Sequence, residues 1–160
     1  MKLWILRHAR AEAGSATGKD RDRELAAAGW RACRNLKRWI RNHNIELPEK
    51  ILVSPSLRTR QTATAVFENL NGPTPEIQEE LWLAGAPVLA RLIQTLAPEG
   101  DGGLALVGHN PGLEDLVHQL GGDLPVIGLK PGTLVILEVD RPLNTGQART
   151  VQVVEANESV

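Results

Sequence analysis

Short apolar segments alternate with amphipathic segments along most of this chain, and this alternation restricts its fold more than any other feature. Runs with the length and composition of strands occupy five places: Lys2–Leu6, Lys50–Val53, Leu104–Val107, Thr133–Val139 and Ala148–Val154. Helical patterns lie between them: about Asp22 to Asn44, from Ser54-Pro55-Ser56 to about Leu70, near Pro87–Leu96, and from Gly108–Gly112 to about Leu120. The segment Thr74–Gly85 has no clear pattern. This order predicts an α/β fold, a three-layer α/β/α sandwich with a mostly parallel central sheet and a hairpin at its end.

The composition indicates one globular domain with balanced charge. A chain of 160 residues with 42% hydrophobic residues has the size of one domain and enough apolar surface for a core, so we expect a single domain over residues 1–160. Its 18 Lys and Arg face 19 Asp and Glu, which leaves no field to attract nucleic acid or a membrane surface. Cys33 is the only cysteine, and no apolar run reaches membrane-spanning length. We therefore expect a cytoplasmic protein without a disulfide.

Basic and titratable side chains stand where the first three predicted strands end. Arg7 and His8 directly follow the first strand, Arg58 lies in the first turn of the helix after the second, and His109 follows the third. In a parallel sheet these points share the edge at which open α/β folds bind ligands. A cation in the first helical turn opposes the helix dipole unless an anion sits there. The pattern therefore predicts a seat for phosphate or another oxyanion.

Other reactive or aromatic side chains fit structural roles. His43 suits the C-terminal end of a helix, where a cation is favourable, and His118 is interpreted as structural too. Cys33 and the four tryptophans fit a core or a partly buried surface. Arg60 is equally compatible with the phosphate seat and with a place in solvent.

Three sequence blocks resemble the signature of the histidine phosphatase superfamily, also called the phosphoglycerate mutase-like fold. They are LRHA at Leu6–Ala9, SPSLRTRQTA at Ser54–Ala63 and GHNP at Gly108–Pro111. The segments VSPSLRTRQT and VGHNPGLE are most similar to those of the SixA-type phosphohistidine phosphatase branch. A weaker block, DRDRELAAAG at Asp20–Gly29, resembles that branch through Asp20, Arg23 and Leu25. Ala9 stands where many members have glycine.

The resemblance implies a role for each matching residue. His8 is implied as the acceptor of the phosphoryl group, while Arg7, Arg58 and His109 hold its oxygens and Arg23 helps to bind the substrate. We expect these neighbouring charges to lower the pKa of His8 and so to favour its nucleophilic, neutral form. Phosphoryl transfer needs mainly positioning and neutralisation of charge, so we expect no metal and no other cofactor.

The substrate prediction rests on a missing acid. An oxygen ester needs a general acid to protonate its leaving group, and superfamily members that cleave esters carry a carboxylate where this chain has Leu83. This absence, and the lack of an insertion long enough for a lid, favour a phosphohistidine on a partner protein such as a phosphotransfer domain. Glu79, Glu80 or Glu114 remains a candidate for the acid.

Three functions therefore stay open. The favoured one is a phosphohistidine phosphatase that works through phospho-His8. The second is a metal-independent phosphomonoesterase acting on small phosphate esters, and a mutase is less favoured than either. The third is a module that binds phosphate or a phosphoprotein without turnover.

Overall fold

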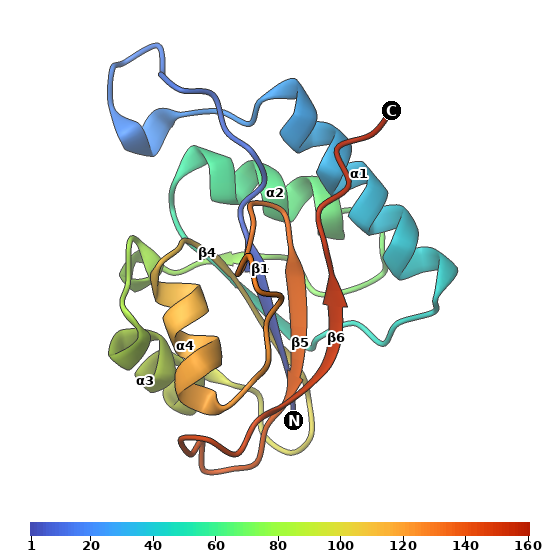
Figure 1. The fold of residues 1–160 in the computed structure, drawn as a ribbon, viewed down its shortest axis with the longest axis vertical. Coiled ribbons are helices and arrows are strands. Elements are labelled where there is room, and N and C mark those ends of the chain that lie inside the picture. Colours follow the sequence, from blue (N-terminus) through green and yellow to red (C-terminus); the bar gives the residue numbers. More distant parts are fainter.

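A six-stranded mixed sheet forms the centre of the computed structural model, which describes all residues 1–160 (Figure 1). Its strands are β1 (Lys2–Arg7), β2 (Lys50–Val53), β3 (Glu76–Ile77), β4 (Leu104–Gly108), β5 (Leu134–Glu138) and β6 (Arg149–Val154). They lie in the order β3-β2-β4-β1-β5-β6. The first four strands in this order are parallel, while β5 and β6 are antiparallel to their neighbours. The predicted α/β fold with a mostly parallel sheet and a terminal hairpin is confirmed.

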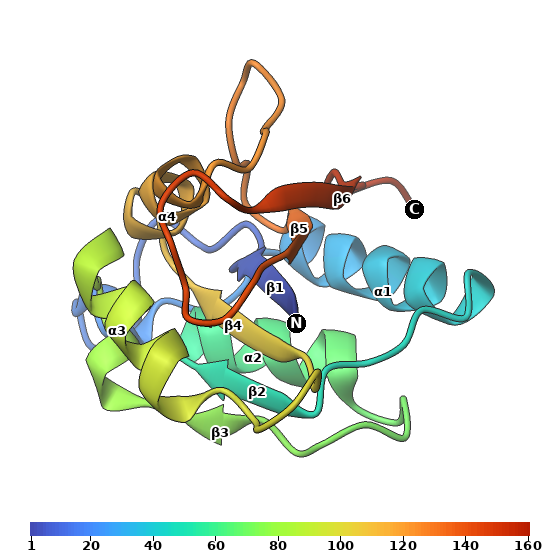
Figure 2. The ribbon, with the colours of Figure 1, turned by 90° about the horizontal axis from the view of Figure 1, so that it is seen from below.

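Helices cover both faces of this sheet and make the three predicted layers. They are α1 (Ala27–Asn42), α2 (Leu57–Phe67), α3 (Ala86–Leu96) and α4 (Gly112–Leu120), with short 3-10 turns η1 (Asp20–Asp22) and η2 (Glu79–Leu81). Figure 2 shows α1 on one side of the sheet and α3 and α4 on the other. None of these helices combines the length and the apolar content that a membrane span requires.

Two apolar clusters hold the layers together, one on each face of the sheet. There are two because successive side chains of a strand point to opposite faces. In β1, Leu3 and Ile5 pack with α3 and α4, whereas Trp4 and Leu6 pack with α1 and α2. All four are at most 1% exposed. Burial on both faces explains why β1 is a continuous apolar run without polar alternation.

The predicted first helix begins later than its sequence pattern indicates. Asp22 belongs to η1, and α1 begins only at Ala27. Tertiary contacts hold the residues between in extended form: the backbone N–H of Leu25 donates to the side-chain oxygen of Gln61 at 2.8 Å, and Ala26 donates to the Arg10 carbonyl at 2.9 Å. The expected start at Asp22 is therefore wrong, since long-range pairing outweighs the local helical periodicity.

Two further boundaries differ from the pattern. The helix expected to reach about Leu70 ends at Phe67, and both Asn69 and Asn71 adopt positive φ, which stops a helix. The unpatterned segment 74–85 contains β3 and η2, elements too short to leave a periodic signal.

Candidate active site

Two histidines meet where the parallel strands β1 and β4 end. Arg7 pairs with Gly108 in the sheet, so the residues that follow each strand, His8 and His109, become neighbours. Their ring centroids lie 5.5 Å apart, and the residues are only 9% and 5% exposed. The structure thus brings together two residues that the sequence separates by about a hundred positions.

His8 is held with one ring nitrogen occupied. Its Nδ1 lies 2.8 Å from the carbonyl oxygen of Ala9, to which it donates in the neutral tautomer protonated at Nδ1. Burial, followed by the charges of Arg58 and Arg7, lowers the pKa of His8 to about 4. The ring is therefore neutral at pH 7, with the lone pair on Nε2. The expected direction of the shift is confirmed, although burial contributes more than the arginines.

The alanine after His8 fits its place. Ala9 is fully buried, and its backbone N–H donates to the hydroxyl of Thr62 at 3.0 Å. It is not among the residues with positive φ. The departure from glycine at this position therefore causes no backbone strain.

His109 is buried beside Ser54, whose sequence pattern predicts only a helix start. Its Nε2 lies 2.7 Å from the hydroxyl oxygen of Ser54. Burial, and then the charges of His8 and Arg58, lowers the pKa of His109 to about 3. The ring is neutral at pH 7, and in the tautomer whose Nε2 accepts from the Ser54 hydroxyl its proton lies on Nδ1. Burial therefore disfavours a charged His109.

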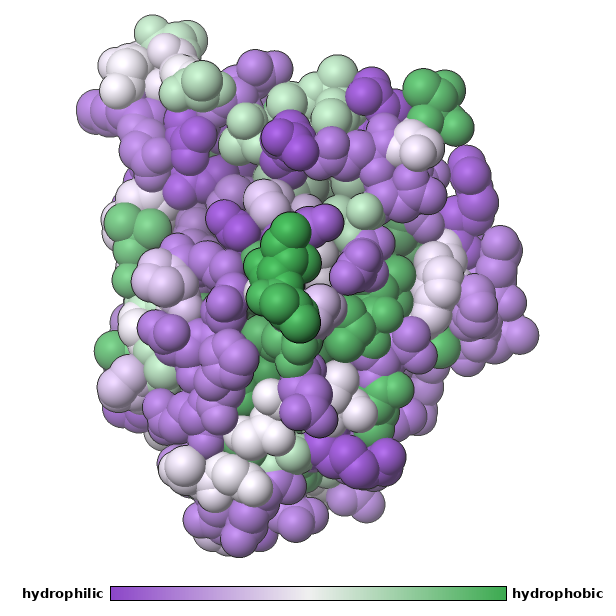
Figure 3. Space-filling view, in the orientation of Figure 1, coloured by the Kyte–Doolittle hydropathy of each residue, from purple (hydrophilic) through white to green (hydrophobic).

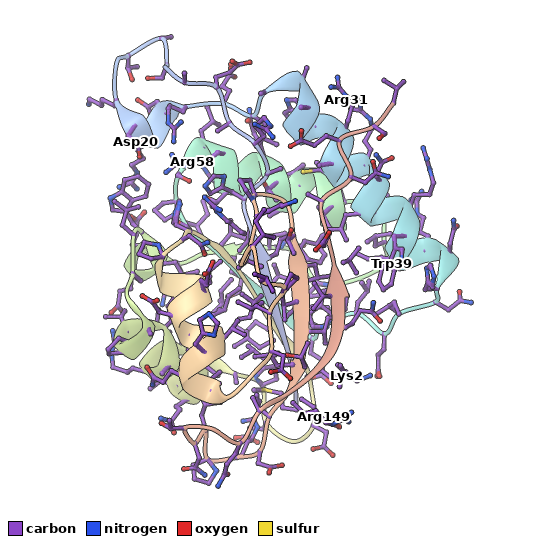
Figure 4. All side chains as sticks on the ribbon, in the orientation of Figure 1. Lys2, Asp20, Arg31, Trp39, Arg58 and Arg149 are labelled. Atoms are coloured by element: carbon purple, nitrogen blue, oxygen red, sulfur yellow. The ribbon has the colours of Figure 1, made fainter.

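Arg58 is buried in the first turn of α2 and pairs with an anion of the chain itself (Figure 4). One Nη donates to the Asp20 carbonyl at 2.8 Å, and the other lies 3.1 Å from the Asp20 carboxylate. Burial opposes ionisation of Asp20, but the charges and hydrogen bonds of Arg58 and Arg23 outweigh it and lower the Asp20 pKa. The carboxylate of Asp20 thus supplies part of the negative charge that is expected beside a cation in the first turn of a helix.

Arg23 lies on the far side of the same carboxylate. Its Nε is 2.9 Å from the other oxygen of Asp20, and one Nη donates to the Glu12 carbonyl at 2.9 Å. The structure therefore brings Arg23 next to Arg58 through Asp20, with two of its three nitrogens already paired.

Three buried nitrogens of the site have no partner within the chain. They are Nε of Arg7, Nε of Arg58 and Nδ1 of His109. The ends of the arginines are tied to backbone carbonyls, since Arg7 donates to Leu129 at 2.9 Å just as Arg58 donates to Asp20. Buried donors normally find an acceptor. Two guanidinium groups and an N–H beside His8 therefore suit an anion with several oxygens.

Trp82 forms a wall of this site, a role that the sequence analysis missed. Its ring meets His109 edge-on with centroids 5.3 Å apart, and the guanidinium of Arg58 lies 5.6 Å from its centroid. Trp82 lies at the end of η2, in the segment without a sequence pattern. The only signal in the sequence is its place directly before Leu83, the position where ester-cleaving members carry an acid. In the structure Leu83 is 58% exposed and has a positive φ of 48°.

The three candidate acids all have partners within the chain, and those of Glu114 adjoin the site. Glu79 pairs with Arg21 at 3.0 Å, and Glu80 pairs with Arg91. Glu114 accepts hydrogen bonds from the backbone N–H of Leu129 at 2.9 Å and from the Asn110 amide at 3.1 Å.

The side chains interpreted as structural lie on helices outside the paired histidines. His43 stacks on Trp39 and lies 2.9 Å from its carbonyl at the end of α1. His118 is exposed on α4, and Cys33 is buried in the core. Arg60 is exposed and donates to the Pro55 carbonyl at 3.0 Å, so its contact is with the helix start.

Comparison with known proteins agrees with this geometry. The family model of the histidine phosphatase superfamily (branch 1) matches residues 3–82. The phosphohistidine phosphatase SixA of Escherichia coli (strain K12) is 32% identical over 122 residues, which cover 75% of this chain and 74% of that protein.

Solved structures match over nearly the whole length. The protein histidine phosphatase SixA complexed with tungstate superposes with a TM-score of 0.81 and 25% identity, covering 96% of both chains. A SixA protein from Agrobacterium tumefaciens superposes with a TM-score of 0.78 and 25% identity, covering 96% of this chain and 97% of that one. The family match, the relative and these superpositions identify the chain as a phosphatase that belongs to the histidine phosphatase superfamily.

Proposed function

We propose that this phosphatase removes phosphoryl groups from phosphohistidine on a partner protein, through a covalent intermediate on His8. The observation that carries the proposal is the buried, neutral imidazole of His8, whose Nε2 is unoccupied while Nδ1 contacts the Ala9 carbonyl. The relatives named for SixA support the substrate class. The tungstate bound to one of them supports an oxyanion seat, because tungstate and phosphate are both tetrahedral oxyanions.

The reaction divides into two displacements at phosphorus. In the first, the Nε2 lone pair of His8 forms a bond to phosphorus while the bond to the substrate imidazole breaks, and that imidazole leaves with a proton from water. In the second, water forms the new P–O bond while the P–N bond to His8 breaks and its electrons return to Nε2. The proton that this water loses neutralises the hydroxide left by the first step, and phosphate leaves. In this scheme Arg7, Arg58 and His109 donate to the phosphoryl oxygens through the three nitrogens that lack partners.

The preference for a P–N bond follows from the lack of an unpaired carboxylate to act as general acid. Leu83 stands at the position of the general acid, and Glu79, Glu80 and Glu114 are held by other partners. An imidazole leaves as a neutral ring once it is protonated, so it needs less help than an alkoxide. No contact in the site favours the phosphomonoesterase alternative.

Because β1 and β6 belong to one sheet, we also propose that residues 1–160 form one domain.

The test compares two substrates and one variant. We expect a phosphohistidine-bearing phosphotransfer protein to be turned over faster than p-nitrophenyl phosphate, an oxygen ester. Acid-quenched gels or mass spectra taken in the first turnover should show phosphoenzyme in the wild type and none in His8→Ala. Equal or better turnover of several oxygen esters would contradict the P–N preference. Full activity of His8→Ala would contradict the mechanism.

A further inference from the structure

The loop between α4 and β5 carries two apolar side chains at the tip of a tight turn. The backbone N–H of Gly128 donates to the Pro125 carbonyl at 2.7 Å, which makes Val126 and Ile127 the central residues of a four-residue turn. Their relative exposures are 110% and 67%. Glycine, proline, asparagine, aspartate and serine dominate such positions. Two β-branched apolar residues there gain nothing from the turn and lose contact with any core.

This turn projects from the body of the protein. Figure 2 shows the loop between α4 and β5 standing clear of the sheet and helices. In Figure 3 a hydrophobic cluster stands out over this loop, surrounded mainly by hydrophilic surface. Most of the surface of both side chains is therefore available to another molecule.

The base of the same loop is fixed to the proposed phosphoryl seat. The backbone N–H of Gly132 lies 3.1 Å from the Arg7 carbonyl and 3.0 Å from the His8 carbonyl. Leu129 is buried, accepts from the Arg7 guanidinium and donates to Glu114. These contacts place the loop on the rim of the site and hold its base in a defined position.

We propose that the Val126–Ile127 turn is a docking element for the protein whose phosphohistidine enters the site. The inference rests on the proposed function and names the contact that selects its substrate. Because His8 and Arg58 are buried, a phosphorylated side chain must reach inward while the surface around it lies against the rim. An apolar tip gains free energy only when it meets apolar surface. A hydrated small phosphate offers none, whereas a folded partner does.

The experiment separates docking from chemistry by using two phosphoramidate substrates. The double variant Val126→Ser with Ile127→Ser is compared with the wild type on a histidine-phosphorylated phosphotransfer protein and on phosphoimidazole. Burial of two apolar side chains predicts a loss of at least about tenfold in kcat/KM on the protein. On phosphoimidazole, kcat/KM should stay within about twofold, since neither side chain takes part in the seat.

Two controls make the result specific. Val126→Leu with Ile127→Leu keeps the tip apolar and should retain most of the activity on the protein. Val160→Ser changes an apolar side chain of 113% exposure at the C-terminus and should have no effect.

Other outcomes refute the proposal in different ways. Unchanged activity of the serine variant on the protein, or equal losses on both substrates, would show that the turn does not dock the partner. A wild-type dimer that the serine variant converts to a monomer, in sedimentation velocity, would assign the turn to a second copy of the chain. If the wild type turns over phosphoimidazole but not the phosphoprotein, the protein substrate itself is refuted, and the docking role with it.

Discussion

The buried environment of His8 predicts activity at a pH where an ordinary histidine would be protonated. The perturbation is acidification from pH 8 to pH 5. With a pKa of about 4, about nine tenths of His8 remains neutral at pH 5, whereas a histidine with a pKa of about 6.5 would be only about 3% neutral. The two cases differ about thirtyfold in the concentration of the nucleophile, and the rate of phosphoenzyme formation should differ in proportion.

The assay is single-turnover phosphorylation of the enzyme by phosphoimidazole, with substrate loss measured in enzyme-free blanks at each pH. Nitrogen chemical shifts of the His8 ring, followed by NMR in the resting enzyme, give its protonation directly. Because burial is the largest cause of the shift, the Arg58→Gln variant should keep the His8 pKa well below 6.5. A rate and a ring titration that both fall by half near pH 6.5 would refute the burial argument. A normal pKa in Arg58→Gln alone would assign the shift to charge.

Three further predictions concern the free energy of unfolding and the support of the site. Between pH 6.5 and pH 5 the low pKa values of His8 and His109 mean that the unfolded chain binds more protons, so stability falls by about 1.6 kcal/mol for each ring and about 3 kcal/mol in total; urea unfolding should show about half of this total fall in His8→Gln. Ser54→Ala removes the hydroxyl beside His109 and should slow phosphoenzyme formation about fivefold, the equivalent of one hydrogen bond of about 1 kcal/mol; an unchanged burst rate would exclude this role. Asp20→Asn should lower the free energy of unfolding at pH 7 by only about 1 kcal/mol, because the Asp20 side chain is 55% exposed; a urea midpoint equal to the wild type would show that the pair with Arg58 adds nothing.

The sequence was sufficient to predict where the main site residues lie. Apolar runs of four to five residues mark β1, β2 and β4, and a parallel sheet brings their carboxyl ends to one edge. Arg7, His8 and His109 follow directly from that arrangement, because each is fixed to a strand end by the chain itself.

Contacts between loops could not be predicted in the same way. The pair of Arg58 with Asp20 joins positions 38 residues apart, and neither the start of α2 nor the 3-10 turn η1 determines where the other lies. Trp82 belongs to a segment whose elements are too short to produce a periodic pattern. Ser54 was treated as part of a helix start, whereas Ser56 caps α2 and Ser54 contacts His109.

The electrostatics of the site separate the proposed nucleophile from the charge proposed to bind its substrate. Both histidines are neutral at pH 7 because they are buried, and the positive charge comes from Arg7 and Arg58. Each arginine donates from an Nη to a backbone carbonyl, and both Nε atoms are buried without a partner in the chain. In the proposed mechanism such a site supplies a nucleophile at neutral pH without a general base. The proposed reaction takes the proton of the leaving group from water, which suits an imidazole far better than an alkoxide.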